Sequence, residues 1–250
     1  MVQRLSKLSA VRGIIDRRIL ANYRIDPGVA ATQLPAPFEP KLVNGYGIGG
    51  LCLIRLKRIR PRLLPLRVGI DSENAAHRIA VMWESNGEQC EGVYIPRRDT
   101  NSAINAIVGG RIFPGEHHRA RFEVKETEQS FDVGFTSRDG QCSMRIQARL
   151  TNNFPTGSVF ADLNASSDFF EAGALGYSAT RQGGRYDGLE LSCRSWSVQP
   201  LAIDSVASSF FDNQTRFPQG SISFDHALLM RGIEHQWHQR GVMRCDTNPT

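Results

Sequence analysis

The segment from Gly109 to Ala120 carries the densest group of residues that could perform acid–base chemistry. Glu116, His117 and His118 are consecutive, and Arg111 precedes them by five positions. Imidazole titrates near neutral pH, and a neighbouring carboxylate can exchange or orient its proton, so this group could act as a catalytic acid and base. A solvated polar loop has the same composition. The residues alone leave both interpretations open.

Two further groups could bind an anion. Glu73 and Arg78 flank the start of an apolar stretch, where they could line a cavity. They could equally pair at the surface, where such a pair contributes only about 0–1 kcal/mol. Arg97 and Arg98 are adjacent at a predicted strand end, but one of them could simply pair with Asp99.

Two histidines near the C-terminus have a spacing that suits a metal ion if their segment is helical. His235 and His238 stand at i and i+3. The His-Glu-x-x-His spacing and a third ligand are both absent, so we predict no metal site and no cofactor.

A basic stretch in the first third of the chain raises the question of nucleic-acid binding. Leucine and isoleucine, rather than stacking aromatic residues, interleave its arginines, and no helix-turn-helix, zinc-finger or RNP signature occurs. We predict a solvated rim or a lid over a cavity, and no nucleic-acid partner. The basic residues are Arg55, Lys57, Arg58, Arg60, Arg62 and Arg67.

The composition indicates an ordinary globular protein. The 250 residues are 40% hydrophobic and 22% charged, which provides a core and excludes a fully disordered chain. No stretch approaches 18 apolar residues, and charges interrupt the N-terminal region, so we predict no membrane span, no leader and a cytoplasmic location. The interrupting charges are Arg12, Asp16, Arg17 and Arg18.

The cysteines predict neither disulfides nor a zinc ribbon. They are odd in number, far apart and without a Cys-x-x-Cys pair. Three of them lie in apolar strand patterns, where a buried inert thiol is the simplest interpretation. The five are Cys52, Cys90, Cys142, Cys193 and Cys245.

The hydrophobic pattern predicts mostly short strands and a few short helices. An apolar residue at every third position over 2–11 predicts an amphipathic helix, and Asp26-Pro27 is a helix start. Further helices are predicted over 100–108 and 166–172, the latter capped by Ser166 or Ser167. Strands are predicted over 19–25, 51–57, 78–83, 92–95, 189–193, 196–206 and 221–224, with a loop over 58–67 and turns at Asn44-Gly45 and Ser85-Asn86-Gly87.

The clearest alternation runs from residue 121 to residue 149. Apolar and polar residues alternate through three stretches, with a turn at Asp139-Gly140, which predicts an antiparallel meander with one wet face. We therefore predict one α+β domain over 1–250: a large antiparallel cone-like barrel or sandwich with short peripheral helices, an internal cavity and a frayed tail at 245–250.

The order of several short motifs resembles an uncharacterised bacterial family, a domain of unknown function related to acetoacetate decarboxylase. The resemblance covers most of the chain, and the order of the motifs is more specific than any single one. It implies a cone-like antiparallel barrel with a buried polar cavity. The matching segments are Tyr23–Pro27, Leu34–Pro40, Asn44–Tyr46, Glu73–Arg78, Gly92–Asp99 and Tyr186–Trp196.

The resemblance also implies a specific chemical difference. The decarboxylases carry a Lys-Lys pair in a Gly-Arg-Glu…Gly-Phe-Pro-Lys-Lys-x-Ala motif, which supplies the lysine that forms the Schiff base. Anchored on Ala120, the matching positions here are His117 and His118, and Ile112 stands where the family has Glu. An imidazole has no primary amine, so we predict that Schiff-base decarboxylation is absent. Lys125 is a reserve candidate for the amine.

Three functions remain open. The chain could bind a small anionic carbonyl or carboxylate compound without turnover, using Glu73, Arg78, Arg97 or Arg111. It could be a lyase or hydratase that uses His117 or His118 as acid and base, or a structural barrel whose polar residues satisfy one another. The family also implies a possible homo-oligomer.

Overall fold

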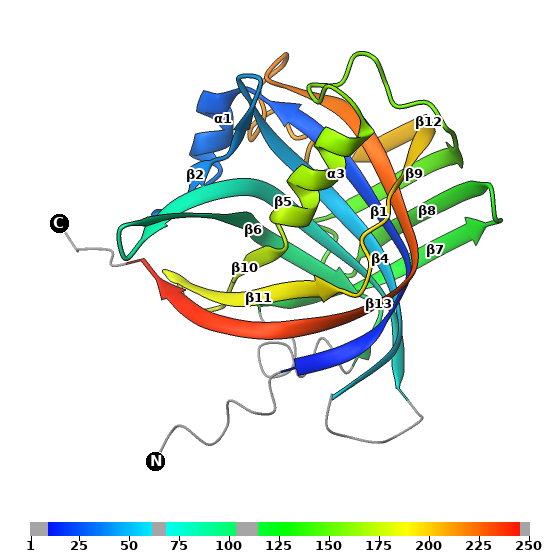
Figure 1. Ribbon diagram of the computed structural model, residues 1–250, viewed down its shortest axis with the longest axis horizontal. Helices are drawn as coiled ribbons and strands as arrows, with labels where there is room; N and C mark the ends of the chain where they lie inside the picture. The colour runs from blue at the N-terminus through cyan, green and yellow to red at the C-terminus, as the bar shows by residue number, and fades with distance from the viewer. Residues whose placement is uncertain (1–9, 62–68, 104–114, 246–250) are drawn as a thin grey trace.

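The computed structural model describes residues 10–61, 69–103 and 115–245, and strands dominate it (Figure 1). Four long strands, β1, β4, β5 and β13, form the centre, and the others extend from them. The elements are β1 (Ala10–Ile25), α1 (Pro27–Thr32), β2 (Glu39–Pro40), β3 (Leu42–Val43), β4 (Tyr46–Pro61), β5 (Ile70–Ser85), β6 (Glu88–Thr100), β7 (His117–Glu126), β8 (Ser130–Ser137), β9 (Ser143–Leu150), α3 (Leu163–Ala172), β10 (Leu175–Ala179), β11 (Arg185–Cys193), β12 (Gln199–Ser208) and β13 (Ile222–Arg244).

The sheet closes on itself in two ways. In the first, β6, β10 and β11 return to β13, and with the four central strands they form what we call the small ring. In the second, β6, β7, β8, β9 and β12 return to β13 and form the large ring with the same central strands. The predicted α+β fold with a large, mostly antiparallel body is confirmed. Two pairings, β10 with β6 and β6 with β7, are parallel, so the sheet is mixed.

The central strands are buried on both faces. On β1, Ile19 packs into the core of the large ring, whereas its neighbour Leu20 packs on the opposite face with Phe170 of α3. On β13, the four consecutive residues from Ala227 to Met230 are each at most 1% exposed. A strand with two dry faces loses the apolar–polar alternation that marks a half-exposed strand. The sequence therefore predicted β1 and β13 as much shorter elements than they are.

The predicted helix starts are confirmed in part. Asp26 caps α1, because its Oδ1 accepts the backbone N–H of Val29 at 3.1 Å. The helix predicted over 166–172 exists as α3 but begins earlier, and Asp162 is its cap instead of Ser166 or Ser167.

Three predicted turns are confirmed, and each has a residue in the left-handed region. Asn44 and Asn86 have φ of 48° and 54°, and Gly140 has φ of 70°. Asparagine and glycine tolerate this conformation best. The last of these turns joins β8 to β9, so the predicted meander of β7, β8 and β9 is confirmed.

Two predictions about secondary structure are wrong. The stretch from Arg58 to Pro61 is not a loop but the end of β4, which continues through a bulge where Arg58 has φ of 56°. His235 and His238 lie on strand β13, not on a helix. Residues three apart on a strand point to opposite faces, so these two cannot share a metal ion. Most of the helices predicted over 2–11 and 100–108 lies outside the described residues.

The cysteines and the helices of the described residues can also be compared with the composition. Its five cysteines are free thiols, with Cys52 and Cys142 buried. Across residues 10–61, 69–103 and 115–245, no helix combines the length and the apolar character needed to cross a membrane.

Candidate functional site

A row of residues crosses the face of the central strands that the small ring encloses. His117 on β7 pairs with Arg98 on β6, and Arg98 pairs with Ala76 on β5. Ala76 pairs with Cys52 on β4, and Cys52 pairs with Leu20 on β1. Directly paired residues stand side by side on one face of a sheet. The register therefore places the thiol, the guanidinium and the imidazole along one line.

A second row runs beside the first and contains Arg78, Gly50, Asn22 and His226. A Cβ atom on Gly50 would lie 3.3 Å from Nη2 of Arg78 and 3.2 Å from Oδ1 of Asn22. It would also lie 2.6 Å from a backbone oxygen. The glycine thus leaves the space in which the Arg78 guanidinium crosses β4 and donates to Asn22.

The hydrogen bonds in the second row fix the protonation of His226. Arg78 can only donate, so Oδ1 of Asn22 is the acceptor and its Nδ2 donates to Nε2 of His226 at 3.0 Å. The proton of His226 is therefore on Nδ1, which donates to Oδ2 of Asp225 at 2.5 Å. Burial lowers the pKa of His226, which keeps the ring neutral. The result is a continuous chain from Asp225 to Arg78.

A β-bulge makes this chain possible. Asn22 pairs with His226, whereas the next residue, Tyr23, pairs with Phe224, so Asp225 is the extra residue between them. Consecutive residues on a regular strand point to opposite faces, and a bulge removes that constraint. Asp225 can therefore bond to the ring of its own neighbour in sequence.

Ser166 on α3 completes an arrangement of serine, histidine and aspartate. Its Oγ lies 2.8 Å from Nε2 of His226. The order matches that of a nucleophilic triad. Ser166 is 0% exposed, however, and a nucleophile must reach its substrate. We assign Ser166, His226 and Asp225 to holding Arg78 in place.

Three guanidiniums on this face have no carboxylate partner in the described part of the chain. Arg98 donates to Oγ of Ser178 at 2.9 Å, and Arg78 donates to Asn22. Arg18 bonds only to sulfur atoms, at 3.2 Å from Cys52 Sγ and 3.7 Å from the Met230 sulfur. The ion pairs of the described residues involve none of the three.

Burial makes these positive charges costly. It lowers the pKa of Arg78 to about 10, an effect that Cys52 opposes and the charge of Arg18 strengthens. Burial also lowers the pKa of Arg98 to about 10. Arg18 and Arg98 nevertheless retain some solvent-exposed surface. A cluster of guanidiniums without a carboxylate partner suits an anion. The anion would supply the negative charge that the protein does not provide and would accept paired N–H bonds.

His117 lies at the end of the first row as a neutral ring. Burial, and next the charge of Arg98, lower its pKa to about 3. Its Nδ1 donates to the carbonyl oxygen of Gly115 at 3.2 Å, so Nε2 is the unprotonated nitrogen. Gly115 has φ of +87°, and a Cβ there would lie 2.5 Å from Cβ of Ser178. Only glycine fits this position.

His118 belongs to a different group. Its Nδ1 lies 3.2 Å from Oδ2 of Asp139. Arg97 joins the same group, because it donates to both Asp99 oxygens at 3.0 Å and to Asp139 at 2.8 Å. Adjacent residues on β7 point to opposite faces, so the two predicted catalytic histidines are separated by the sheet.

Glu73 also lies apart from the three guanidiniums. It accepts hydrogen bonds from Arg17 and from Arg55, each at 2.6 Å. Glu126 bonds to the same two arginines, so the four side chains form a closed ring of ion pairs. Of the predicted ligand-binding residues, Arg78 alone is placed with Arg98 and His117 in the described structure.

The remaining predicted site residues add nothing to this face. Glu116 pairs with Arg181 at 3.2 Å near the surface. Arg111 lies outside the described residues. Arg18 was missed as a site residue because its sequence neighbours Asp16 and Arg17 make it look like part of a solvated charged run.

Comparisons with known proteins identify the family and the fold. The model of the DUF2071 family, described as an uncharacterised conserved protein, matches residues 15–232. No curated protein matches this chain significantly.

Solved structures share the fold at low sequence identity. Acetoacetate decarboxylase from Legionella pneumophila has a TM-score of 0.58 and 12% identity, with 95% of this chain and 88% of that chain covered. An acetoacetate decarboxylase-like enzyme from Sphingomonas wittichii has a TM-score of 0.55 and 10% identity, covering 97% and 94%. The enduracididine biosynthesis enzyme MppR has a TM-score of 0.52 and 13% identity, covering 94% and 86%. With the family model spanning most of its length, the chain belongs to the DUF2071 family and has the acetoacetate decarboxylase-like fold.

Proposed function

We propose that this protein binds a small anionic compound, bearing a carboxylate and a carbonyl group, on the face enclosed by the small ring. Arg18, Arg78 and Arg98 hold the anion, and His117 contacts it. The observation that carries the proposal is that these three buried or half-buried guanidiniums have no carboxylate partner among the described residues. Isolated buried charge is destabilising, so a protein that keeps three such groups together gains only when something negative binds.

The spacing of the three arginines favours a compound with more than one polar group. Arg98 and Arg78 lie in adjacent rows on neighbouring strands, and Arg18 lies across β4 from Arg78. A guanidinium presents parallel N–H groups that match the two oxygens of a carboxylate. One carboxylate would bind the paired N–H groups of one arginine, and a second oxygen-bearing group of the ligand would bind another arginine.

The proposal excludes covalent capture of the ligand as an imine. The motif resemblance implies that His117 and His118 replace the lysine pair of the decarboxylases, and imidazole has no primary amine. Lys41 is bonded to Glu91 at 2.5 Å, and Lys57 to Asp16 at 2.9 Å. Lys125 is exposed on β7. Lys41 also lies over the Phe169 ring, 4.5 Å from its centroid, so its ammonium is held by Glu91 and this ring.

Acid–base catalysis by the two histidines together has no support in this geometry, because they lie on opposite faces of β7. With a pKa of about 3, His117 is a weak base in the empty site. A bound anion would raise that pKa, since it favours the charged imidazolium. We therefore propose binding as the primary function.

The test is thermal unfolding with a panel of compounds at matched ionic strength. We expect keto carboxylates to raise the midpoint by about 5–10 °C when the ligand is about a hundredfold above its Kd. Plain ketones of the same size should have no effect, because they cannot neutralise the arginines. Equal shifts with neutral and anionic compounds would overturn the proposal.

A second prediction concerns the missing imine. Borohydride reduction in the presence of acetoacetate should leave the mass of the full chain unchanged, because only an amine forms the reducible adduct. The His117→Lys variant is the matched positive control, since it restores the amine at the position used by the relatives. Intact-mass and peptide analysis would detect an adduct. An adduct on Lys41, Lys57 or Lys125 of the unmodified protein would contradict the prediction.

A further inference from the structure

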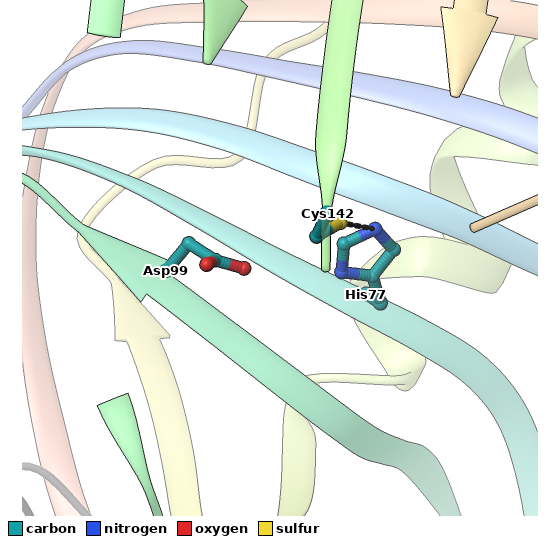
Figure 2. Close-up of side chains that lie close together, drawn as sticks. All are labelled: His77, Asp99 and Cys142. Carbon is teal, nitrogen blue, oxygen red and sulfur yellow. Dashed lines mark hydrogen bonds between the residues drawn. The ribbon is translucent and has the colours of Figure 1, made fainter. Parts of the chain in front are cut away.

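The large ring contains a second buried polar group, on the opposite face of β5 from Arg78. It consists of His77 on β5, Asp99 on β6 and Cys142 directly before β9 (Figure 2). One potential ligand atom from each residue lies within 4.8 Å of the other two. Their exposed fractions are 0%, 0% and 3%. Nothing in the proposed anion site uses these residues.

The geometry is close to what a tetrahedral metal centre needs. Zinc binds sulfur at about 2.3 Å and nitrogen or oxygen at about 2.0–2.2 Å, so its ligand atoms stand roughly 3.3–3.6 Å apart. Nε2 of His77 and Sγ of Cys142 already have a separation of 3.5 Å. The carboxylate of Asp99 must move inward by up to about 1.5 Å, which a side-chain rotation can supply.

The other ring nitrogen of His77, Nδ1, faces the same group. Nδ1 of His77 is buried and makes no hydrogen bond of acceptable geometry. Figure 2 shows this nitrogen, the one without the dashed line, on the side of the ring that faces Asp99. A metal bound through Nε2 leaves the ring proton on Nδ1, so the metal itself does not contact this nitrogen.

The surroundings of His77 are apolar on one side and positively charged on another. Burial, and then the positive charges of Arg97 and Arg216, lower the pKa of His77 to about 3, although the backbone of Arg97 opposes the shift. Phe210 packs against the His77 ring, with ring centroids 4.5 Å apart.

Asp99 can serve a metal and Arg97 at the same time. Each of its oxygens accepts one bond from Arg97 at 3.0 Å, which leaves a lone pair on each. Arg97 also binds Asp139, so one positive charge faces two negative ones in this bonded group. Arg216 adds a second positive charge near His77, so arginines and carboxylates balance here, and the Cys142 thiolate supplies the negative charge that favours a cation.

We propose that His77, Asp99 and Cys142 form a binding site for a divalent transition-metal ion of the zinc class. The combination of thiolate, imidazole and carboxylate selects this class over magnesium or calcium, which take oxygen ligands only. On binding, the Cys142 thiol loses its proton to solvent and forms the sulfur–metal bond, while the metal keeps its charge of +2. Three protein ligands leave the fourth position to water.

The probe for the test is Co²⁺, which reports a thiolate ligand by a near-ultraviolet charge-transfer band. We expect the chelator-treated full-length protein to bind one Co²⁺ per chain, to show this band and to lose the Co²⁺ to added Zn²⁺. Cys142→Ala should abolish the band and weaken binding at least tenfold in equilibrium dialysis. Cys193→Ser, which alters a half-buried thiol in β11, is the matched control and should retain both.

Three outcomes would overturn the proposal. They are no band in the folded wild-type protein, a band that survives in Cys142→Ala, and a band that is lost in Cys193→Ser. Circular dichroism shows whether each variant is folded. If Cys142→Ala does not fold, His77→Gln decides the question, because it keeps the thiol and removes the nitrogen ligand. Binding to His77→Gln with wild-type affinity would contradict the site.

Discussion

Replacing Glu73 with glutamine should lower the free energy of unfolding by about 3–5 kcal/mol, as is typical when one partner of a buried ion pair is removed. Glu73 bonds to Arg17 and Arg55 at 2.6 Å, and the side chain of Arg17 is only 2% exposed. The neutral amide cannot balance these two guanidiniums. Chemical denaturation followed by circular dichroism measures the loss.

A matched control separates this effect from the loss of any glutamate charge. Glu123 pairs with Arg121 at 3.4 Å, and the two side chains are 63% and 80% exposed. Glu123→Gln should change the free energy of unfolding by no more than about 0.5 kcal/mol. Equal effects of the two substitutions would show that burial of the ion-pair network around Arg17 contributes nothing to the free energy of unfolding.

The double variant Arg17→Met, Glu73→Met sharpens the test. It removes a buried positive charge together with a buried negative one, so it should cost less than Glu73→Gln alone. A double variant that is less stable than the single one would mean that the Glu73 effect arises from packing and not from an unpaired charge.

The second large effect is expected at Arg98. Arg98→Met should raise the free energy of unfolding of the ligand-free protein by about 1–3 kcal/mol, because it removes a buried charge without a counter-ion. The pKa of Arg98 is lowered to about 10 on burial, so the penalty for its charged form is fully present at neutral pH and decreases only above that value. Denaturation at pH 7 measures the gain.

Arg98→Met should also abolish measurable ligand binding. Removing one partner of a desolvated charge pair costs about 2–5 kcal/mol, and a loss of about 2.7 kcal/mol corresponds to a hundredfold weaker Kd. Titration calorimetry with the carboxylate found in the thermal panel measures it. Arg121→Met is the control, because Arg121 is exposed and should alter neither quantity. A variant that is less stable yet binds normally would show that Arg98 has a structural role.

Some of the architecture follows from local sequence patterns. Strict alternation predicted β7, β8 and β9, because that meander has one exposed face along which polar residues recur. Asn44-Gly45 and Asn86-Gly87 predicted two turns, because the backbone there has positive φ. Asp26 and Pro27 predicted the start of α1 for an equally local reason.

The site is different, because its members are brought together by pairings between distant strands. Arg18, Cys52 and Arg98 share a face only after β1, β4, β5 and β6 have paired in one register. A shift of one residue in any of these pairings would move a side chain to the opposite face. The sequence contains the residues but not the register, so Arg18 was missed and Glu73 was placed with the ligand.

The amino-acid sequence alone therefore determined which side chains are available for chemistry. Arginine is abundant, lysine is scarce, and imidazoles stand at positions 117 and 118. The tertiary structure decided which face each group occupies. It separated His117 from His118, closed Glu73 into a ring of ion pairs and, through the bulge at Asp225, linked His226 to Arg78. The physical reason is that the central strands are buried on both faces, so hydrophobicity along the chain carries no record of which side is which.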